Sequence, residues 1–543
     1  MDEKELAWQR SRRYTPEQLT VARVVLDDIR SGRPVLEAIR SYPLQGGGYI
    51  AKHTLIHEYY RQVKEGTLQP DDELLIRMRM KPMRTLSGVS TVTVLTEPHP
   101  CPGECIFCPD DARLPKSYLK EEPGAARAYQ NHFDPFLQVA SRIEAYRATG
   151  HPVDKIELLI LGGTWSAYPR DYREWFVKRC FDAMNGIDSP SLESAQKWNE
   201  SAGSRNVGLV IETRPDCITP EEIIHLRQLG VTKVQMGAQS LDDAILLKNC
   251  RGHTRSHTLA ACALLRAAGF KIVLHWMPNL LGATPDSDRV DFLHLWQDGF
   301  CPDELKIYPT QLLQEAPLYK LWQQGEYQPY TTRQLIDLIV DLKPSIPPYC
   351  RVNRIIRDIP ASYIKAGSRR SNLRQDILEE LDRRGQRCRC IRCREIRSRK
   401  VNADDLVLQD EMYQAAFAEE HFIQYATRDD YLAGYLRLSL PAKAGDIKAA
   451  NLLSGLYALV PELDGAALIR EVHVFGQSLE VGSEQEGAAQ HSGLGSALLL
   501  EAERIARKFG FSRLAVIAAV GTRLYYARRG FVQEGLYMTK AIS

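Results

Sequence analysis

The sequence lacks the two features that direct proteins into membranes or out of the cell. It has no recognisable secretory signal peptide, and none of its apolar runs is long enough to span a bilayer. It has 12 cysteines in 543 residues, and without a secretory signal we expect these thiols to stay reduced rather than form disulfides. We therefore expect a cytoplasmic protein with no membrane partner.

The sequence also has almost no net charge, and its formal charge of +2 by itself indicates no particular partner. This balance hides a local excess, because residues 351–400 carry 16 Lys and Arg against 6 Asp and Glu. A basic segment in a near-neutral chain indicates a polyanion that is held at one place. A solvated basic helix face is the alternative explanation of the same charges.

Three cysteines form the most informative motif of the chain. Cys101, Cys105 and Cys108 follow the spacing C-x3-C-x2-C, and no fourth cysteine lies nearby. Cysteine thiolates hold 4Fe–4S clusters, and three ligands leave one iron open for S-adenosylmethionine (SAM). The spacing is typical of radical-SAM enzymes, in which the cluster cleaves SAM to a radical. The alternative is a zinc site with a distant fourth ligand such as His99.

Short β-rich runs separated by helical patterns occupy the part of the chain around this motif. The spacers are mostly long enough for a helix, so the runs predict an α/β fold with a parallel sheet. Six such strands make a partial (β/α)6 barrel, whose active site should lie at the C-terminal ends of its strands. The three cysteines follow the first strand, where this rule places the chemistry. The predicted strands are 88–96, 155–161, 208–212, 232–236, 271–276 and 304–308.

The chain divides into four predicted regions. Residues 1–75 are expected to form a helical, basic N-terminal region, and residues 76–315 the radical-SAM partial barrel. Residues 316–400 are expected to form a basic connecting segment, and residues 401–543 a compact second domain. In the second domain we predict strands near 434–440, 466–475, 513–518 and 531–540 and a helix over about 494–508.

A glycine-rich turn before that helix carries the second chemical signal. Gln490, Gly493 and Gly495 fit the pattern Q-x-x-G-x-G/A, and the glycines let backbone N–H groups approach an anion at the helix N-terminus. The pattern resembles the pyrophosphate loop of GNAT acetyltransferases, which bind acetyl-CoA. A later helix resembles the GNAT helix whose tyrosine lies near the CoA sulfur, which makes Tyr525 and Tyr526 candidate catalytic residues. Plain packing aromatics are the alternative for both.

A second cysteine cluster lies inside the basic segment. Cys388, Cys390 and Cys393 place three thiols within six residues, which indicates a metal site, most simply zinc. Zinc takes four ligands, and Cys350 is the candidate for the fourth, with Cys301 or a histidine as alternatives. A cluster of unliganded thiols is the other explanation. Isolated cysteines that we expect to be core or surface thiols are Cys180, Cys217, Cys250 and Cys262.

The combination of a radical-SAM motif and a GNAT loop resembles the catalytic subunit of Elongator, in its stand-alone bacterial or archaeal form. The resemblance runs from about residue 81 to residue 540. The eukaryotic members have a longer gap between the first two cluster cysteines and lack the second cysteine cluster, so the zinc prediction does not come from them. The matching motifs are KPMRTLSG at 81, GHPVDKIE at 150, GGT at 162, ETRPD at 212, GAQS at 237, RGHT at 251, RDIP at 357, EVHV at 471, QHSGLG at 490 and GTRLYY at 521.

This resemblance implies an enzyme that forms 5-carboxymethyluridine at the wobble uridine, position 34, of tRNA. In the mechanism proposed for the family, the cluster reduces SAM to a 5′-deoxyadenosyl radical, which takes a hydrogen from the methyl group of acetyl-CoA. The carbon radical adds to the uracil ring, and hydrolysis of the thioester releases CoA. The implied cofactors are therefore a 4Fe–4S cluster and SAM, with acetyl-CoA as co-substrate.

The resemblance also implies roles for individual residues. Cys101, Cys105 and Cys108 are expected to ligate the cluster, and Gly162 and Gly163 to hold the amino group of SAM. The expected acetyl-CoA residues are Lys155, the strand Glu471, Val472, His473 and Val474, the loop residues Gln490, Gly493, Leu494, Gly495 and Ser496, and Tyr526.

The implied macromolecular partner is the tRNA anticodon stem-loop. We expect it on Arg- and Lys-rich surfaces from the N-terminus, including Arg10, Arg12 and Arg13, and from residues 351–400. The target uridine must then leave its stack and enter the barrel mouth. Two rival functions are a protein lysine acetyltransferase with a structural iron–sulfur cluster and a tRNA-binding scaffold with degenerate catalysis. The need for accessory subunits and the oligomeric state stay open, and the intact cysteine triad argues against the scaffold.

Overall fold

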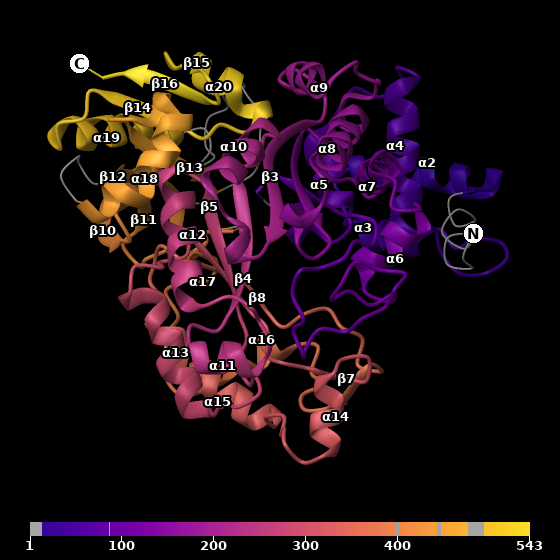
Figure 1. The fold of residues 1–543 in the computed structure, drawn as a ribbon. Coiled ribbons are helices and arrows are strands. Elements are labelled where there is room, and N and C mark those ends of the chain that lie inside the picture. The colour runs from indigo at the N-terminus through magenta and orange to yellow at the C-terminus, as the bar shows by residue number, and fades with distance from the viewer. Residues whose placement is uncertain are drawn as a thin grey trace.

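The computed structural model builds the chain around two seven-stranded sheets (Figure 1). The first sheet is parallel, with neighbouring strands in the order β1-β2-β3-β4-β5-β6-β8. The described residues are 13–85, 87–397, 399, 401–441, 447–475 and 493–542. The strands of the first sheet are β1 (Ser90–Leu95), β2 (Lys155–Leu161), β3 (Arg205–Thr213), β4 (Lys233–Gln239), β5 (Lys271–Trp276), β6 (Glu304–Ile307) and β8 (Arg351–Ile355).

This sheet confirms the predicted α/β partial barrel and adds one strand to it. All six predicted strands are present, and β2 and β5 have the predicted bounds. The seventh strand, β8, lies in the stretch that we predicted to be a connecting segment. Its sequence, RVNRI, has three charged or polar residues among five instead of forming the continuous apolar run of a buried parallel strand. The strand pairs with β6 and forms one edge of the sheet.

Helices follow the strands of this sheet along the chain, and those between the strands cover the outside of the barrel (Figure 1). Several begin with a side-chain cap, as at Thr219 and Thr284, whose hydroxyls accept from backbone N–H groups of the first turn. Among the described residues, no helix is both long enough and apolar enough to cross a membrane. These helices are α6 (Pro123–Gln130), α7 (Pro135–Arg147), α8 (Arg170–Asn185), α9 (Leu192–Asn199), α10 (Pro220–Gln228), α11 (Asp243–Lys248), α12 (Arg255–Ala267), α13 (Pro285–Gln297), α14 (Leu318–Gln323), α15 (Thr332–Leu342), α16 (Leu373–Arg383) and α17 (Ile391–Arg394).

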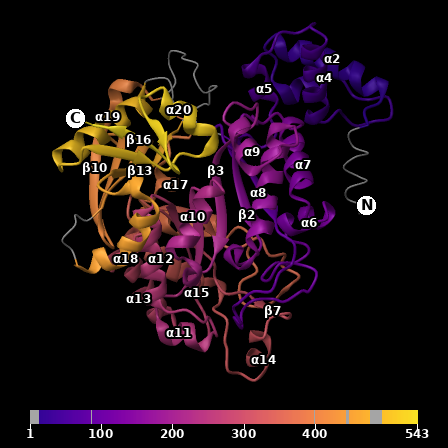
Figure 2. The same cartoon turned by 45° about the horizontal axis from the view of Figure 1, so that its top comes forward.

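The second sheet belongs to the C-terminal domain (Figure 2). Its order is β10-β11-β12-β13-β14-β16-β15, mostly antiparallel, with β13 and β14 parallel. The predicted strand 531–540 is a hairpin whose turn contains Gly535 at φ 54°. The elements of the C-terminal domain are β10 (Leu406–Ala415), β11 (Ala418–Thr427), β12 (Leu432–Pro441), α18 (Ile447–Leu459), β13 (Ala467–Val474), α19 (Leu494–Lys508), β14 (Arg513–Val516), α20 (Arg523–Ala527), β15 (Val532–Glu534) and β16 (Tyr537–Ala541).

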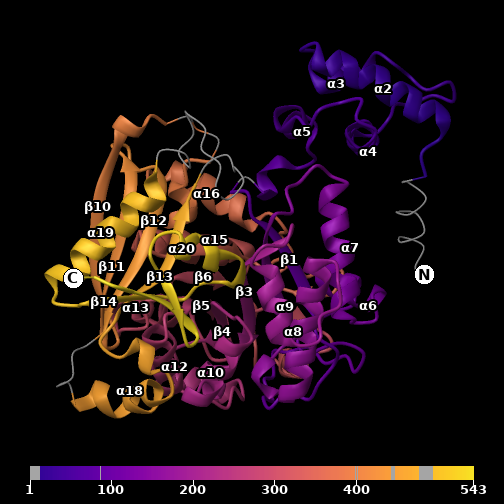
Figure 3. The same ribbon diagram turned by 90° about the horizontal axis from the view of Figure 1, so that it is seen from above.

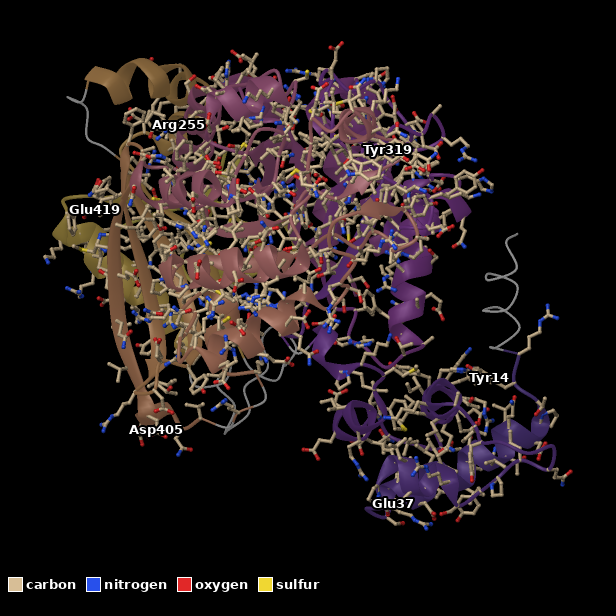
Figure 4. All side chains as sticks on the ribbon, turned by 90° about the horizontal axis from the view of Figure 1, so that it is seen from below. Tyr14, Glu37, Arg255, Tyr319, Asp405 and Glu419 are labelled. Carbon is tan, nitrogen blue, oxygen red and sulfur yellow. The ribbon has the colours of Figure 1, made fainter. Side chains whose placement is uncertain are left out.

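The N-terminal helices form a separate small unit beside α7 (Figure 3). They enclose their own apolar cluster, centred on Leu26, Leu55 and Met78. Met80 and Arg79 then attach the unit to the barrel through hydrogen bonds to the carbonyls of residues 149 and 150. Figure 4 shows Tyr14 and Glu37 on this unit, away from Glu419 of β11. The helices are α2 (Pro16–Arg30), α3 (Val35–Arg40), α4 (Lys52–Lys64) and α5 (Asp72–Met78).

The C-terminal domain packs against the N-terminal ends of the barrel strands. Arg470 of β13 pairs with Asp303, which directly precedes β6, with Nη1–Oδ2 and Nη2–Oδ1 distances of 2.9 and 2.5 Å. Glu471 pairs with Lys271 at the start of β5. A Cβ on Gly521 would come within 2.7 to 3.1 Å of the chain at residues 205 and 206, where β3 begins. The C-terminal domain therefore closes the end of the barrel opposite the cysteine loop.

Candidate functional site

One cavity of about 1140 Å³ runs through the barrel. At the C-terminal ends of the strands it is lined by Phe107, Cys108 and Tyr118 of the cysteine loop. At the other end it is lined by His473 of β13 and Tyr526 of α20. The cavity also reaches both edge strands, β1 and β8, which do not pair with each other. A single space therefore joins the two predicted chemical sites.

The three cysteines of the first motif lie in the loop after β1. Cys105 is buried, and Cys101 and Cys108 are half-buried. Cys101 Sγ lies 3.5 Å from Oγ1 of Thr164, in the turn after β2. Arg251, between β4 and β5, donates from Nη1 to Cys105 Sγ at 3.3 Å. The loop is thus held by the segments that follow neighbouring barrel strands.

Positive charge around this loop favours the thiolate form. A hydrogen bond from Cys108, with nearby Arg251 and Arg214, lowers the pKa of Cys105 to about 5. A Cβ on Gly103 would overlap the guanidinium of Arg214, so this group packs directly on the loop backbone. Nη1 of Arg214 is buried and has no hydrogen-bond partner within the described part of the chain. The low pKa of Cys105 beside two arginines suits a thiolate ligand of a 4Fe–4S cluster, whereas the hydrogen bond to Cys105 and burial raise the pKa of Cys108 well above the ordinary value.

Gly162 and Gly163 form the turn that follows β2, as predicted from their position. Their φ angles are 145° and 88°, in the region that favours glycine. A Cβ on Gly162 would overlap Oγ1 of Thr96, whereas one on Gly163 would lie 3.5 Å from the nearest atom. Tyr168 fastens the turn, because its hydroxyl donates to the carbonyl of Gly162 at 3.2 Å. Gly162 is buried and Gly163 is half-buried, and their contact with the amino group of SAM stays a prediction.

The predicted acetyl-CoA residues divide into those that face the cavity and those that do not. Glu471, Val472 and His473 line it, together with Tyr526. Nε2 of His473 is buried and has no hydrogen-bond partner among the described residues. Burial lowers the pKa of His473 to about 4, so the ring is neutral at pH 7. Gln490 lies outside the described residues.

Gly493, Leu494, Gly495 and Ser496 form the N-terminal turn of α19 and do not line the cavity. Gly493 precedes the helix at φ 72°. A Cβ on Gly495 would lie 2.9 Å from the hydroxyl of Tyr525, so the tyrosine packs closely on the start of the helix. The two tyrosines thus differ, because Tyr525 packs on the helix start while Tyr526 faces the cavity.

Lys155 begins β2 and does not line the cavity. It pairs in register with Arg205 of β3, whose side chain packs against Gly521 of the C-terminal domain. Burial lowers the pKa of Lys155. Its position at the junction of the two domains is compatible with the predicted acetyl-CoA contact, which stays a prediction.

The second cysteine cluster is compact. The Sγ atoms of Cys388, Cys390 and Cys393 all lie within 4.8 Å of one another. Tetrahedral zinc with Zn–S bonds of about 2.3 Å places its sulfurs about 3.8 Å apart, so a small shift would suffice. Hydrogen bonds from Cys388 and Cys393, helped by the charge of Lys343, hold the pKa of Cys390 well below its ordinary value. Lys343 is fully buried, and its Nζ has no hydrogen-bond partner among the described residues.

These thiols and the buried ammonium fit a negatively charged zinc–thiolate centre. The predicted fourth ligand, Cys350, is also buried, and its carbonyl accepts from the N–H of Ile391 at 2.9 Å. Its thiol is not part of the 4.8 Å group. The structure therefore brings three of the four predicted ligands together, and the role of Cys350 stays a prediction.

Many arginines of the basic segment are already paired with carboxylates. The cavity-lining pairs are Arg351–Glu395, Arg354–Asp358 and Arg357–Glu122. Arg392 differs, because it donates to the carbonyl of Asn353 at 2.7 Å and forms no ion pair within the described part of the chain. Burial, with the like charges of Arg374 and Arg351, lowers the pKa of Arg392 to about 10. At the N-terminus, Arg13 is exposed, whereas Arg10 and Arg12 lie outside the described residues.

Comparison with known proteins places this arrangement in a family. A model of the radical SAM superfamily matches residues 99–295, and one of the Radical_SAM C-terminal domain matches residues 302–383. A tRNA uridine(34) acetyltransferase of Dehalococcoides mccartyi is 42% identical over 462 residues, covering 84% of this chain and 98% of the relative. One from Methanocaldococcus jannaschii is 37% identical, covering 95% and 96%. The chain belongs to the Elongator protein 3 (Elp3) family.

A solved Elp3 structure agrees with the fold of this Elp3-family chain. The archaeal Methanocaldococcus infernus Elp3 with an N-terminal deletion superposes with a TM-score of 0.71 at 36% identity, covering 84% of this chain and 99% of that one. The Elongator complex protein 3 of Danio rerio is 35% identical and covers 86% of each chain. The radical-SAM match extends to residue 383, beyond the predicted barrel end at 315, as the position of β8 also requires.

The Elp3-family cavity contains polar residues that sequence reasoning missed. Gln235, His275 and Lys306 come from β4, β5 and β6 and point into the barrel. They lie about 30 to 40 residues apart and match no short motif. Only the register of a parallel sheet could have predicted their proximity, since His275 and Lys306 are paired neighbours of β5 and β6.

Proposed function

We propose that this chain forms 5-carboxymethyluridine at the wobble uridine of tRNA, with acetyl-CoA as the source of the carboxymethyl group. One observation carries the proposal, namely that a single cavity touches both Cys108 of the cysteine loop and His473 of β13. Relatives named tRNA uridine(34) acetyltransferase support uridine 34 as the target. A 4Fe–4S cluster with bound SAM supplies radical chemistry for an acetyl methyl group, which ordinary acetyl transfer to uracil carbon 5 does not offer.

The barrel residues have distinct roles in this proposal. Cys101, Cys105 and Cys108 hold the cluster, and Arg251 favours the thiolate of Cys105 by donating to its sulfur at 3.3 Å. The turn of Gly162 and Gly163 binds the amino group of SAM. These groups all lie at the C-terminal ends of the strands, where barrel enzymes hold their reactants.

The C-terminal domain binds acetyl-CoA in this proposal. The strand Glu471–Val474 contacts the pantetheine arm, and the helix N-terminus at Gly493–Ser496, with Gln490, binds the pyrophosphate through backbone N–H groups. Tyr526 faces the cavity and closes the pocket near the thioester. Lys155 contributes from the barrel, and Tyr525 orients the helix through its contact with Gly495.

The basic segment binds RNA and is held by zinc in this proposal. Cys388, Cys390 and Cys393, with Cys350 as a candidate fourth ligand, hold a structural zinc ion. The ion fixes the short helix α17, which presents Arg392 at the cavity edge. Because Arg392 has no carboxylate partner among the described residues, a phosphate of the anticodon stem-loop suits it better than the paired arginines nearby.

The decisive test is nucleoside mass spectrometry of tRNA incubated anaerobically with the protein, SAM, acetyl-CoA and a reductant. We expect 5-carboxymethyluridine at position 34, and none when SAM or acetyl-CoA is left out. A triple variant with alanine at Cys101, Cys105 and Cys108 should form none. Unmodified tRNA with a protein shown to hold its cluster and to bind both small molecules would refute the proposal.

A second assay separates the proposal from a protein lysine acetyltransferase. Acetyl-CoA hydrolysis should rise when tRNA is added, because the thioester is consumed only when the target base occupies the cavity. Acetylation of a histone peptide at a rate that ignores tRNA would favour the rival function. The cavity argues against that rival, since acetyl transfer to a lysine needs no space that reaches Cys108.

A further inference from the structure

The interior of the barrel carries a layer of polar side chains. Barrel interiors of parallel strands are normally filled by Val, Ile and Leu. Here Gln235 and His275 are 3% and 4% exposed and face the cavity, with the half-buried Lys306 beside them. Buried polar groups are unfavourable unless they find partners. The hydrogen-bond partners that these side chains lack among the described residues indicate which donor and acceptor atoms a ligand should have.

His275 presents an unsatisfied acceptor to the cavity. Oε1 of Gln235 accepts from Lys306 Nζ and lies 3.2 Å from His275 Nε2, so this ring nitrogen must donate. Burial, with the charges of Lys306 and Arg357, lowers the pKa of His275 well below its ordinary value, so the neutral ring has only one N–H. Nδ1 is therefore an acceptor, and it faces Oε1 of Glu212, another acceptor, at 3.6 Å.

Lys306 presents unsatisfied donors close by. Its ammonium contacts Oε1 of Gln235 and lies 5.8 Å from the ring centroid of Tyr308. No carboxylate in the described part of the chain forms an ion pair with it. An ammonium has three N–H donors, so two remain for acceptor oxygens of a ligand. The cavity thus offers a pair of acceptors next to a strong donor.

This pattern is complementary to the imide edge of uracil. Uracil presents an N3–H donor between two carbonyl acceptors, whereas cytosine presents an N3 acceptor beside an amino donor. With cytosine, Lys306 would face a donor, and His275 and Glu212 would face a third acceptor. We propose that His275 and Glu212 accept from N3–H of the target uracil while Lys306 donates to its O4. The inference rests on the proposed function and names the residues that distinguish uridine from cytidine.

Aromatic side chains beside this group support a nucleobase as the occupant. The rings of Tyr308 and His275 are in edge contact with centroids 5.5 Å apart. Tyr118 donates its hydroxyl to Oε2 of Glu212 at 2.9 Å, and Arg357 lies over its ring at 4.9 Å. A base that has left its stack is typically held against aromatic or guanidinium faces. Tyr118 also orients the carboxylate that Nδ1 of His275 faces.

Photo-crosslinking tests the location of the base without requiring turnover. A tRNA anticodon stem-loop with 4-thiouridine at position 34 is irradiated with the protein, and crosslinked peptides are mapped by mass spectrometry. We expect crosslinks to peptides that contain β4, β5 or β6. A stem-loop with the photoreactive base at a neighbouring loop position is the control. Crosslinks from position 34 only to the C-terminal domain or the N-terminal helices would overturn the proposal.

Two variants test the recognition itself. Lys306→Met, or Lys306→Leu as a second donor-free variant, should lower modification of U34 roughly tenfold to a hundredfold, as expected when a hydrogen bond from a charged donor is lost. Its affinity for tRNA should be nearly unchanged, because phosphate contacts supply most of that affinity. Glu212→Gln should raise the use of a C34 substrate relative to U34, since the new amide can donate to cytosine N3. Lys320→Met, at an exposed lysine of α14, is the matched control and should change nothing.

The outcomes separate this inference from the proposed function. The cluster absorption band and circular dichroism establish that each variant is folded, and Lys306→Leu, which also lacks a donor, replaces Lys306→Met if the latter is not. If both variants modified U34 at the level of the wild type with unchanged U34-to-C34 ratios, the assignment of these recognition residues would be overturned. The proposed function would be unaffected. If the wild type modifies no uridine, the proposed function fails, and the crosslinks alone decide whether a base occupies the barrel.

Discussion

Removing the charge of Asp303 should destabilise the junction between the two domains more than any exposed charge change. Asp303 is fully buried, and its carboxylate accepts from both Nη atoms of Arg470 and from the N–H of Ile272 at 2.8 Å. Arg437 Nη1 lies 3.3 Å away and Arg266 is close enough to act on it electrostatically. Three buried arginines are balanced here by three buried or nearly buried carboxylates, those of Asp303, Glu420 and Glu471.

Asp303→Asn keeps the shape of the side chain but leaves this group with one uncompensated positive charge. Breaking a buried ion pair in this way costs about 3–5 kcal/mol, a large share of the roughly 5–15 kcal/mol that stabilises a folded domain. The assay is urea unfolding, read at the first transition because two packed domains need not unfold together. Asp286→Asn, at a carboxylate that is 96% exposed, is the control and should cost less than about 1 kcal/mol.

The pH dependence gives an independent check on the same residue. Burial would raise the pKa of Asp303, but Arg470, Arg437 and Arg266 outweigh it and hold that pKa well below its ordinary value. A depressed pKa stabilises the fold above the unfolded value of about 4 and loses that effect as pH falls towards the folded value. Wild type should therefore lose stability below about pH 4 more steeply than Asp303→Asn. If Asp303→Asn lost no more unfolding free energy than Asp286→Asn, the reasoning would be refuted. In the double variant Asp303→Asn/Arg470→Met, the removal of the unpaired arginine should restore part of the lost stability.

Three further predictions concern the metal sites and the glycine turn. Alanine at Cys101, Cys105 and Cys108 together should abolish the 4Fe–4S absorption band after anaerobic reconstitution, and a surviving band would contradict the ligand assignment. Cys390→Ser should lower the zinc content measured by elemental analysis, whereas serine at the exposed Cys250 should not. Gly162→Ala should cost more stability in urea unfolding than Gly186→Ala. Both glycines have positive φ, but only at position 162 would a Cβ meet another atom, so equal losses would argue against the overlap with Thr96.

The barrel strands could be predicted because their sequences are short runs rich in apolar and β-branched residues, as in the KIELLIL of β2. Edge strands do not give this signal. Three of the five residues of β8 are charged or polar, and β10 is largely exposed, with the polar run Gln409, Asp410 and Glu411 near its centre. Neither strand was predicted, because pairing with one neighbour and burial of one face leave little trace in the sequence.

In the candidate site too, residues that lie close together in the sequence could be predicted, whereas residues that meet only in the folded chain could not. Cysteines within eight or six residues can be grouped as a candidate centre from their spacing alone, and the structure brings the Sγ atoms of the second group, Cys388, Cys390 and Cys393, within 4.8 Å of one another. Residues that converge from separate elements cannot be assigned in this way, which is why Lys306 was missed and why Cys350 could be proposed but not placed. The sequence also indicated a basic surface, but not that Arg351 is paired with Glu395 while Arg392 has no ion pair within the described ranges.

The closure of the N-terminal end of the barrel by the C-terminal domain has a consequence for the kinetics of binding of the reactants. Cys108 and Tyr526 line opposite ends of the cavity, so a nucleoside cofactor and a thioester would occupy places that do not overlap. Neither should compete with the other for its position. Initial-rate measurements should therefore give intersecting lines, and CoA should act as a competitive inhibitor against acetyl-CoA but not against SAM.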